Sequence, residues 1–503
     1  MNIKTEKQKA IFDTVIITAF AVVILVMCVS HVHSFSDLLP SKPVFDPALK
    51  LSSSELDEST ITRTGEFNID DGKVEVLETE MQAGKGTILQ KHYFMPDGVI
   101  VNAGRIITDV PGSTTVLSFS CGSGMIRWFE DGAWQELDLE ETTYTPSCAF
   151  FDTDRGYYIV YLPKSYTDEE YGIVYYNEEN DGRVEATREE NGDLRINIIA
   201  NNTGGDHSDW FYTYSSERII DWTNKTARSF WSPYRNDGYG KMLYDNYYWI
   251  IESEEKPAET QKEYSNRPSC YFGLSCVEGA PYYPAMKGLA VFIIDTMMQS
   301  RSEEGYAPCY AASEWLQSDY NIRTDYYDTR FNSDLAEIYI AAYQRFGGDE
   351  FLDALNKYMD YYVSFADDQG WYWDKGMFIP DYYSKDSSKT HTALNHQLAE
   401  MSVLYKCSEL LERPELTELA DKMLIAIEES AKYWIKSDHD LHYAVFPDRS
   451  FGLQDYDYLT YDDMFNMQNQ LVGMGRKRSS GLKRLMDNKK IWMDRQEITL
   501  YKK

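Results

Sequence analysis

Positive charge is scarce in this chain of 503 residues. It has 49 lysines and arginines against 81 aspartates and glutamates, which gives a formal net charge of -32. A surface that binds DNA or RNA needs clustered lysines and arginines to neutralise phosphate groups. The composition therefore argues against nucleic acid as a partner. It fits a polyanionic substrate only where basic residues converge locally.

Cysteine pairs of the Cys-x-x-Cys type are missing, which argues against a structural zinc site. His439 and His442 lie beside two aspartates, but a solvated turn explains this cluster better than a metal site does. We therefore expect neither a metal nor a cofactor.

A signal-peptide cleavage site is absent after the apolar run 15–32, which is long enough to cross a hydrocarbon core of about 30 Å. Lys4, Lys7 and Lys9 precede this run and favour a cytoplasmic N-terminus. We expect a cytoplasmic stub and single-span membrane anchor over 1–33, with the body on the extracytoplasmic side. This side is the cell surface or periplasm in a bacterium, or the Golgi lumen in a eukaryote.

The body has six cysteines outside the apolar run, an even number that permits disulfides in an oxidising compartment. Proximity in the sequence favours the pairs Cys121–Cys148 and Cys270–Cys276. A homodimer is an option that the sequence leaves open.

Aromatic residues are plentiful, at 15% of the chain, and 40 of them are tyrosines. A tyrosine combines a flat apolar face with a hydroxyl, which suits contact with sugar rings as well as an amphipathic surface. A stalk rich in Ser, Pro, Asp and Glu is predicted over 34–65. The region 66–256 follows as a β-sandwich-like domain, because turn signals separate short β-branched and aromatic runs. Such runs lie at 114–120, 157–162, 172–176 and 194–199.

The apolar period changes to about 3.6 residues after a linker over 257–284, which indicates helices. The segment 285–475 is predicted to be an α/α toroid of about four helical hairpins, and 476–503 a basic C-terminal helix or tail. The fold class is therefore multidomain α+β. Helices are expected at about 285–299, 332–346, 349–366, 391–412, 415–436, 458–473 and 480–492.

Several stretches of the helical region resemble the heparosan-glucuronate 5-epimerases. They are the helix pair opening with 328–346, the helix of Leu394 and Asn395, the segment Asp440-Leu-His-Tyr443, and Asp457-Tyr-Leu-Thr-Tyr461. The order of anchor, β-domain and helical barrel is also similar. The family's Met-Ala-Gln-Gly is replaced by 331–334, however, so a shared scaffold with altered chemistry is an alternative.

The resemblance implies a uronyl epimerase, which removes a proton from carbon 5 of a uronic acid in a polysaccharide and returns one on the opposite face. This reaction needs two acid/base groups and a group that holds the carboxylate. Tyr443, Tyr458 and Asp381 are the candidate catalytic residues. Arg330 has the planar fork that binds a carboxylate, although a salt bridge to Asp328 or Asp334 explains it equally well. The candidate substrate-binding residues are Arg330, Asn332, Asp334, Tyr382, His391, Asn395 and Tyr461, and Lys389 is a further candidate cation.

Two other classes of function stay open. A toroid glycoside hydrolase would use a carboxylic acid and a carboxylate, for which Asp334, Asp381, Asp457 and Asp462 are candidates, and a lyase would abstract the same proton as an epimerase. A non-catalytic glycan-binding subunit of a polysaccharide assembly or export system would keep the scaffold without the chemistry.

Overall fold

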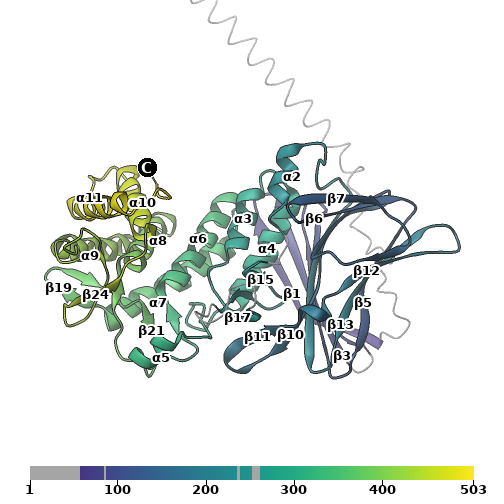
Figure 1. Ribbon diagram of the computed structural model, residues 1–503, viewed down its shortest axis with the longest axis horizontal. Coiled ribbons are helices and arrows are strands. Elements are labelled where there is room, and N and C mark those ends of the chain that lie inside the picture. Colours follow the sequence, from purple (N-terminus) through teal and green to yellow (C-terminus); the bar gives the residue numbers. More distant parts are fainter. Residues whose placement is uncertain (1–56, 84–85, 235–237, 252–260, 503) are drawn as a thin grey trace, which may run out of the picture. The chain divides into compact units, whose positions relative to one another are not determined.

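The computed structural model describes residues 57–83, 86–234, 238–251 and 261–502. The predicted membrane anchor lies outside the described residues. Among the helices of the described part, none combines the length and the apolar character that crossing a membrane requires. Figure 1 shows strands in the first half of the described chain and helices in the second, so the fold is multidomain α+β.

A large antiparallel sheet dominates the N-terminal half. Its strands form because apolar and polar side chains alternate along them; in β3, for example, buried positions recur with a period close to two. The strand order is β1 (Asp57–Ile69), β2 (Gly72–Ala83), β3 (Gly86–Phe94), β4 (Ile100–Thr108), β14 (Asp206–Ser215), β10 (Gly156–Asp168), β11 (Ile173–Tyr176), β17 (Glu263–Asn266), β16 (Tyr247–Ile250) and β15 (Gly240–Met242). In addition, β9 (Cys148–Thr153) pairs with β10, β6 (Gly124–Glu130) with β9, and β7 (Ala133–Asp138) with β6.

A smaller sheet packs against the large one, as the predicted sandwich requires. Phe119 of the small sheet stacks on Tyr158 of β10 with ring centroids 4.0 Å apart and meets Phe151 of β9 edge to face. The predicted strands at 114–120, 157–162, 172–176 and 194–199 are confirmed as β5, β10, β11 and β13. The small sheet has the order β5 (Gly112–Cys121), β13 (Leu194–Asn202), β12 (Arg183–Arg188) and β8 (Thr142–Tyr144).

The seven predicted helices are all confirmed. They are α4 (Pro284–Gln299), α6 (Thr329–Phe346), α7 (Asp349–Gln369), α8 (Leu394–Leu410), α9 (Pro414–Ser430), α10 (Leu459–Gly473) and α11 (Ser480–Arg495). Three shorter helices were not predicted: α2 (Lys225–Trp231), α3 (Tyr271–Gly279) and α5 (Glu314–Tyr320). The range predicted as a linker contains β17 and α3, and β1 begins within the range predicted as a stalk.

The long helices pack in two layers. In one layer α6 contacts α3 and α8, and α8 contacts α10; in the other α7 contacts α9, and α9 contacts α11. Helices α6, α8 and α10 therefore lie side by side and run in the same direction, with their N-terminal ends close together. Closure of this row into a toroid stays a prediction.

Helix α4 joins the helices to the large sheet. Its Gly288 permits close packing, because a Cβ there would come within 2.8 Å of a Val101 methyl group of β4. Its one carboxylate, Asp295, is 2% exposed and accepts hydrogen bonds from the Tyr93 hydroxyl at 2.7 Å and from Arg63. The two halves consequently share one hydrophobic core.

The predicted disulfides are wrong. Cys121, Cys270 and Cys276 are free thiols, so neither predicted pair is formed, and the cysteines in the described part of the chain are buried. They act as small apolar residues of the core. Cys270 has a further role, because its Sγ accepts a hydrogen bond from the Gly273 N–H in the first turn of α3.

Candidate functional site

Short strand pairs bring distant segments together where α6 and α8 begin. In one pair, β18 (Tyr327–Asp328) lies beside β21 (Tyr382–Tyr383), so that Asp328 is opposite Tyr382. In the other, β22 (Thr392–Ala393) lies beside β23 (His442–Val445), which also pairs with β24 (Phe451–Gln454). Helix N-termini carry free backbone N–H groups, so polar side chains gather there readily.

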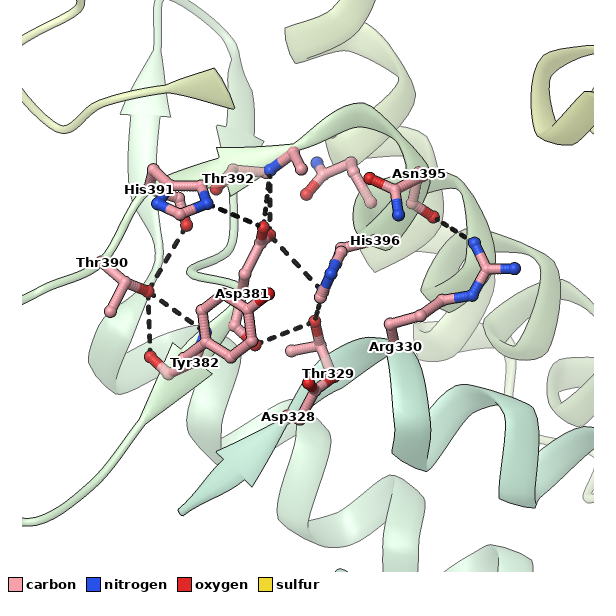
Figure 2. Close-up of polar contacts among 12 residues, drawn as sticks. Asp328, Thr329, Arg330, Asp381, Tyr382, Thr390, His391, Thr392, Asn395 and His396 are labelled. Atoms are coloured by element: carbon pink, nitrogen blue, oxygen red, sulfur yellow. Dashed lines mark hydrogen bonds and ion pairs between the residues drawn. The ribbon is translucent and has the colours of Figure 1, made fainter. Parts of the chain in front are cut away.

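Asp381 is at the centre of this cluster and is fully buried (Figure 2). Its two carboxyl oxygens accept hydrogen bonds from the Ala393 N–H, at 2.9 and 3.0 Å. His391 Nε2 lies 3.4 Å from one oxygen, and His396 Nδ1 lies 3.8 Å from the other. The carboxyl group is thus held between two imidazoles, with no Lys or Arg paired to it among the described residues.

Each histidine is oriented by a hydroxyl. His391 Nδ1 lies 2.8 Å from the Tyr320 hydroxyl; when this hydroxyl donates, the neutral ring carries its proton on Nε2, facing Asp381. The Thr329 hydroxyl donates to the Asp381 carbonyl, so His396 donates through Nδ1 to Thr329. Burial lowers the pKa of His391 to about 4 and that of His396 well below its usual value, and both rings are therefore neutral at neutral pH.

The two carboxyl groups of the cluster favour their protonated forms. Burial raises the pKa of Asp381 well above its usual range, which outweighs the effect of the Ala393 N–H, and nearby Asp328 raises it further. Burial likewise raises the pKa of Asp328 to about 7, although the Phe331 N–H bonds to it as the cap of α6. Perturbed acids of this kind gather at catalytic sites more often than elsewhere.

Tyrosines connect the buried cluster with the surface. The Tyr443 ring packs edge to face on His391 at 5.7 Å and on Tyr456 at 5.6 Å. Tyr382 and Tyr456 each share a side-chain hydrogen bond with Tyr443. Because Tyr456 is 49% exposed, this line leads from Asp381 to solvent. Burial raises the pKa of Tyr443 well above its usual value, so the phenol keeps its proton.

Arg330 points toward a second, open region beside the cluster. Its guanidinium donates to Asp463 at 2.7 Å, to Asp334 at 3.3 Å and to the Asn395 carbonyl at 3.2 Å. The region is a pocket of about 290 Å³ along α6, α8 and α10. Its walls include Glu337 and Lys406, which are also paired with each other. Arg330 is thus already bound to two carboxylates.

The other predicted site residues either have a structural role or lie outside the cluster. Asn332 is buried and bonds to the backbone of Ala307 and Asp328, so it positions the start of α6. Tyr458 precedes α10 and is 39% exposed, and no hydrogen bond or ring contact joins its side chain to the cluster in the described part of the chain. Tyr461 packs against Tyr501, and Lys389 is exposed.

Several residues of the site were not among the predicted ones. His396 lies one residue after the predicted Asn395, and Tyr456 lies two residues before Tyr458. Trp315 of α5 is 40% exposed and packs edge to face on Tyr382. The sequence feature that could have identified Asp328 is its position directly before a predicted helix, which is typical of an N-cap residue. Over the described residues, no three His, Cys, Asp or Glu side chains are grouped so that they could hold a metal ion.

No family model matches the chain, and no curated protein matches its sequence. Among solved structures, it is similar to a D-mannose isomerase, with 11% identity and a TM-score of 0.32 over 44% of this chain and 57% of that chain. It therefore spans less than two thirds of that relative's length. It is also similar to the cellobiose 2-epimerase from Bacillus thermoamylovorans (11% identity, TM-score 0.35, 52% and 67% coverage). A family 76 glycoside hydrolase from a bovine Bacteroides thetaiotaomicron strain is a third (10% identity, TM-score 0.33, 77% and 75% coverage). Likenesses this weak leave the function to be inferred from the site itself.

Proposed function

We propose that the protein is a carbohydrate-active enzyme of the uronyl 5-epimerase type. It would remove the proton from carbon 5 of a uronic acid residue in a polysaccharide and return a proton on the opposite face. The observation that supports this most is the tyrosine line, in which Tyr443 connects the exposed Tyr456 with the buried Asp381 and His391.

Tyr443 is the proton donor in this proposal. Its raised pKa keeps the phenol protonated until a carbanion-like carbon is formed next to it. Asp381 and His391 are positioning residues, because they are fully buried and reach a substrate only through Tyr443 and Tyr382. Tyr458, which is 39% exposed, is assigned to the opposite face as the group that takes the original proton, an assignment that rests on the sequence.

Substrate binding is assigned to the exposed aromatic side chains and the pocket. Trp315 offers a flat apolar surface 5.8 Å from His391, and such a surface suits the apolar face of a sugar ring. The pocket along α6, α8 and α10 would hold neighbouring sugars of the chain, as the inner helices of an α/α toroid would. We also propose that the body is extracytoplasmic and anchored through residues 15–32, which rests on the sequence alone.

A glycoside hydrolase is the second candidate, and one observation favours it. The pKa of Asp328, raised to about 7 by burial, is in the range of a general acid that donates to a leaving glycosidic oxygen. In this alternative a second carboxylate of the site would activate water.

Incubation of the full chain with candidate polysaccharides in deuterated water separates these functions. The proposal predicts carbon-bound deuterium in the recovered polysaccharide, detected by NMR, without new reducing ends. New reducing ends without deuterium would move the assignment to a hydrolase. New unsaturated chain ends would indicate a lyase.

A further inference from the structure

Arg267 lies against the first turn of α6, near enough to Asp328 of the cluster for its charge to counter the rise in the pKa of that carboxyl. It follows β17, and its guanidinium carbon is 4.4 Å from the centroid of the Phe331 ring of α6. The Trp249 ring of β16 is 4.6 Å away and the Tyr271 ring of α3 is 5.8 Å away. Three aromatic rings from three elements thus surround one arginine.

The cation has no carboxylate within salt-bridge distance among the described residues, although the chain has 81 acidic residues. The Nε atom of Arg267 is also buried without a hydrogen-bond partner. A buried donor without an acceptor costs free energy, so this arginine is held in place at a cost to stability.

The Tyr271 hydroxyl takes one N–H group of the guanidinium, which leaves its other N–H groups for a ligand. A guanidinium contacts an aromatic ring through its face, whereas its N–H groups point outward in its own plane. That edge matches the two oxygens of a carboxylate or a sulfate. The geometry therefore prepares Arg267 for an acidic group rather than for a neutral hydroxyl.

The surroundings of Arg267 also fit a sugar ring. Tyr271 is 47% exposed and packs edge to face on Trp249, and Tyr239, which is 53% exposed, lies 6.2 Å from the same indole. These three rings form an exposed aromatic surface around the cation, named here the Trp249 platform. Aromatic surfaces bind the apolar face of sugars while a cation fixes the acidic substituent.

We infer that Arg267 and the Trp249 platform form a subsite for an acidic sugar residue, which carries a carboxylate or a sulfate. This inference rests on the proposed action on a glycan. It assigns binding of the acidic group to Arg267, because Arg330 is already bound to Asp334 and Asp463. Phe331 links the two places: its ring contacts Arg267, and its N–H bonds to Asp328 of the cluster. The subsite and Asp328 of the cluster are therefore neighbours at the first turn of α6.

Isothermal titration calorimetry of the full chain tests the subsite without turnover. The probes are a hexamer of β-1,4-linked glucuronic acid, cellohexaose as its neutral counterpart, and a sulfated cellohexaose. Arg267→Met should weaken binding of the acidic hexamers by about tenfold or more and leave cellohexaose binding unchanged. Arg267→Lys keeps the positive charge but loses the planar fork of N–H groups. Its affinity for the acidic hexamers should lie between those of the wild type and of Arg267→Met. If the sulfated cellohexaose binds more tightly than the glucuronic acid hexamer, the acidic group is a sulfate. If the glucuronic acid hexamer binds more tightly, it is a carboxylate.

Arg449→Met is the matched control. Arg449 also lies over an indole, that of Trp373 at 5.0 Å, but it is paired with Asp374 at 3.4 Å on another surface. This variant should bind all probes like the wild type. The inference is overturned if Arg267→Met binds the acidic hexamers normally, or loses acidic and neutral hexamers equally, with melting temperature unchanged.

The subsite and the proposed reaction can fail separately. Arg267-dependent binding without deuterium exchange at carbon would keep the subsite and remove the epimerase function. Deuterium exchange by the wild type, together with unaltered binding of the acidic hexamers by Arg267→Met, would keep the epimerase function and remove the subsite.

Discussion

Lys489 and Asp381 are both fully buried, yet only Lys489 lies next to a charge of opposite sign. The Lys489 ammonium donates to Asp440 at 2.6 Å and lies 2.9 Å from Asp455. Burial acts to raise the pKa of Asp440, but the hydrogen bond and charge of Lys489 outweigh it and lower that pKa; the pKa of Asp455 stays raised because burial prevails there. At Asp381 no such cation offsets burial.

This difference separates a cluster that stabilises the fold from one that is suited to chemistry. The Lys489 cluster holds α11 against the segments before β23 and α10, and with Lys436, which also pairs with Asp440, two cations face two carboxylates. The Asp381 cluster combines neutral imidazoles, a carboxyl that favours its proton, and a phenol leading to the surface. Groups whose pKa values are shifted without an ion pair are able to give up or take protons during a reaction.

Replacing Lys489 by Met should have the largest effect on stability. It leaves the buried Asp455 without its cation and Asp440 with Lys436 alone, and breaking a buried ion pair typically costs about 3–5 kcal/mol of the free energy of unfolding. Urea denaturation measures this cost. The exposed neighbour Lys490, paired with Asp494, is the control, and Lys490→Met should leave stability nearly unchanged. If both variants are equally stable, the Lys489 cluster is not a structural one.

Replacing Asp328 by Asn should change how stability depends on pH. Because burial raises the pKa of Asp328 to about 7, its contribution to stability is complete below about pH 4 and is lost as the pH rises toward 7. Asn caps α6 equally well but stays neutral. The variant should match the wild type at acidic pH and exceed it at pH 8 by roughly 2–4 kcal/mol.

Urea denaturation at both pH values gives this difference. Asp457→Asn, on the exposed segment before α10, should show the pH profile of the wild type. A wild-type profile in the Asp328 variant as well would mean that Asp328 is ionised throughout.

The smallest effect is expected at Tyr461, a predicted substrate-binding residue that packs on Tyr501 instead. Tyr461→Phe keeps the ring, so deuterium exchange should change by less than about twofold, with stability within about 0.5 kcal/mol. Parallel assays of exchange and urea denaturation measure both. A large loss of exchange would extend the site to this part of α10.

The sequence predicted local structure better than it predicted the site. The seven long helices and four strands followed from apolar periodicity, whereas α3 is short and starts at a cysteine cap that has no common sequence signal. The resemblance and the residue types singled out Asp381, His391 and Tyr443, which do come together. The pairing of Arg330 with Asp334 was among the options from the sequence and is present, whereas Asp463 was not predictable, because it lies 133 positions away and comes near through the packing of α6 and α10 on α8.

Tyr443→Phe tests the central claim most directly, namely that the Tyr443 hydroxyl, positioned by the Asp381 cluster, donates the proton. The variant keeps the ring that packs on His391 and Tyr456. In deuterated water, incorporation into the polysaccharide should fall by about 10²–10⁴-fold, as for the loss of a general acid. The free energy of unfolding should change by about 1 kcal/mol or less. Exchange at the wild-type rate in a folded Tyr443→Phe protein would contradict the account.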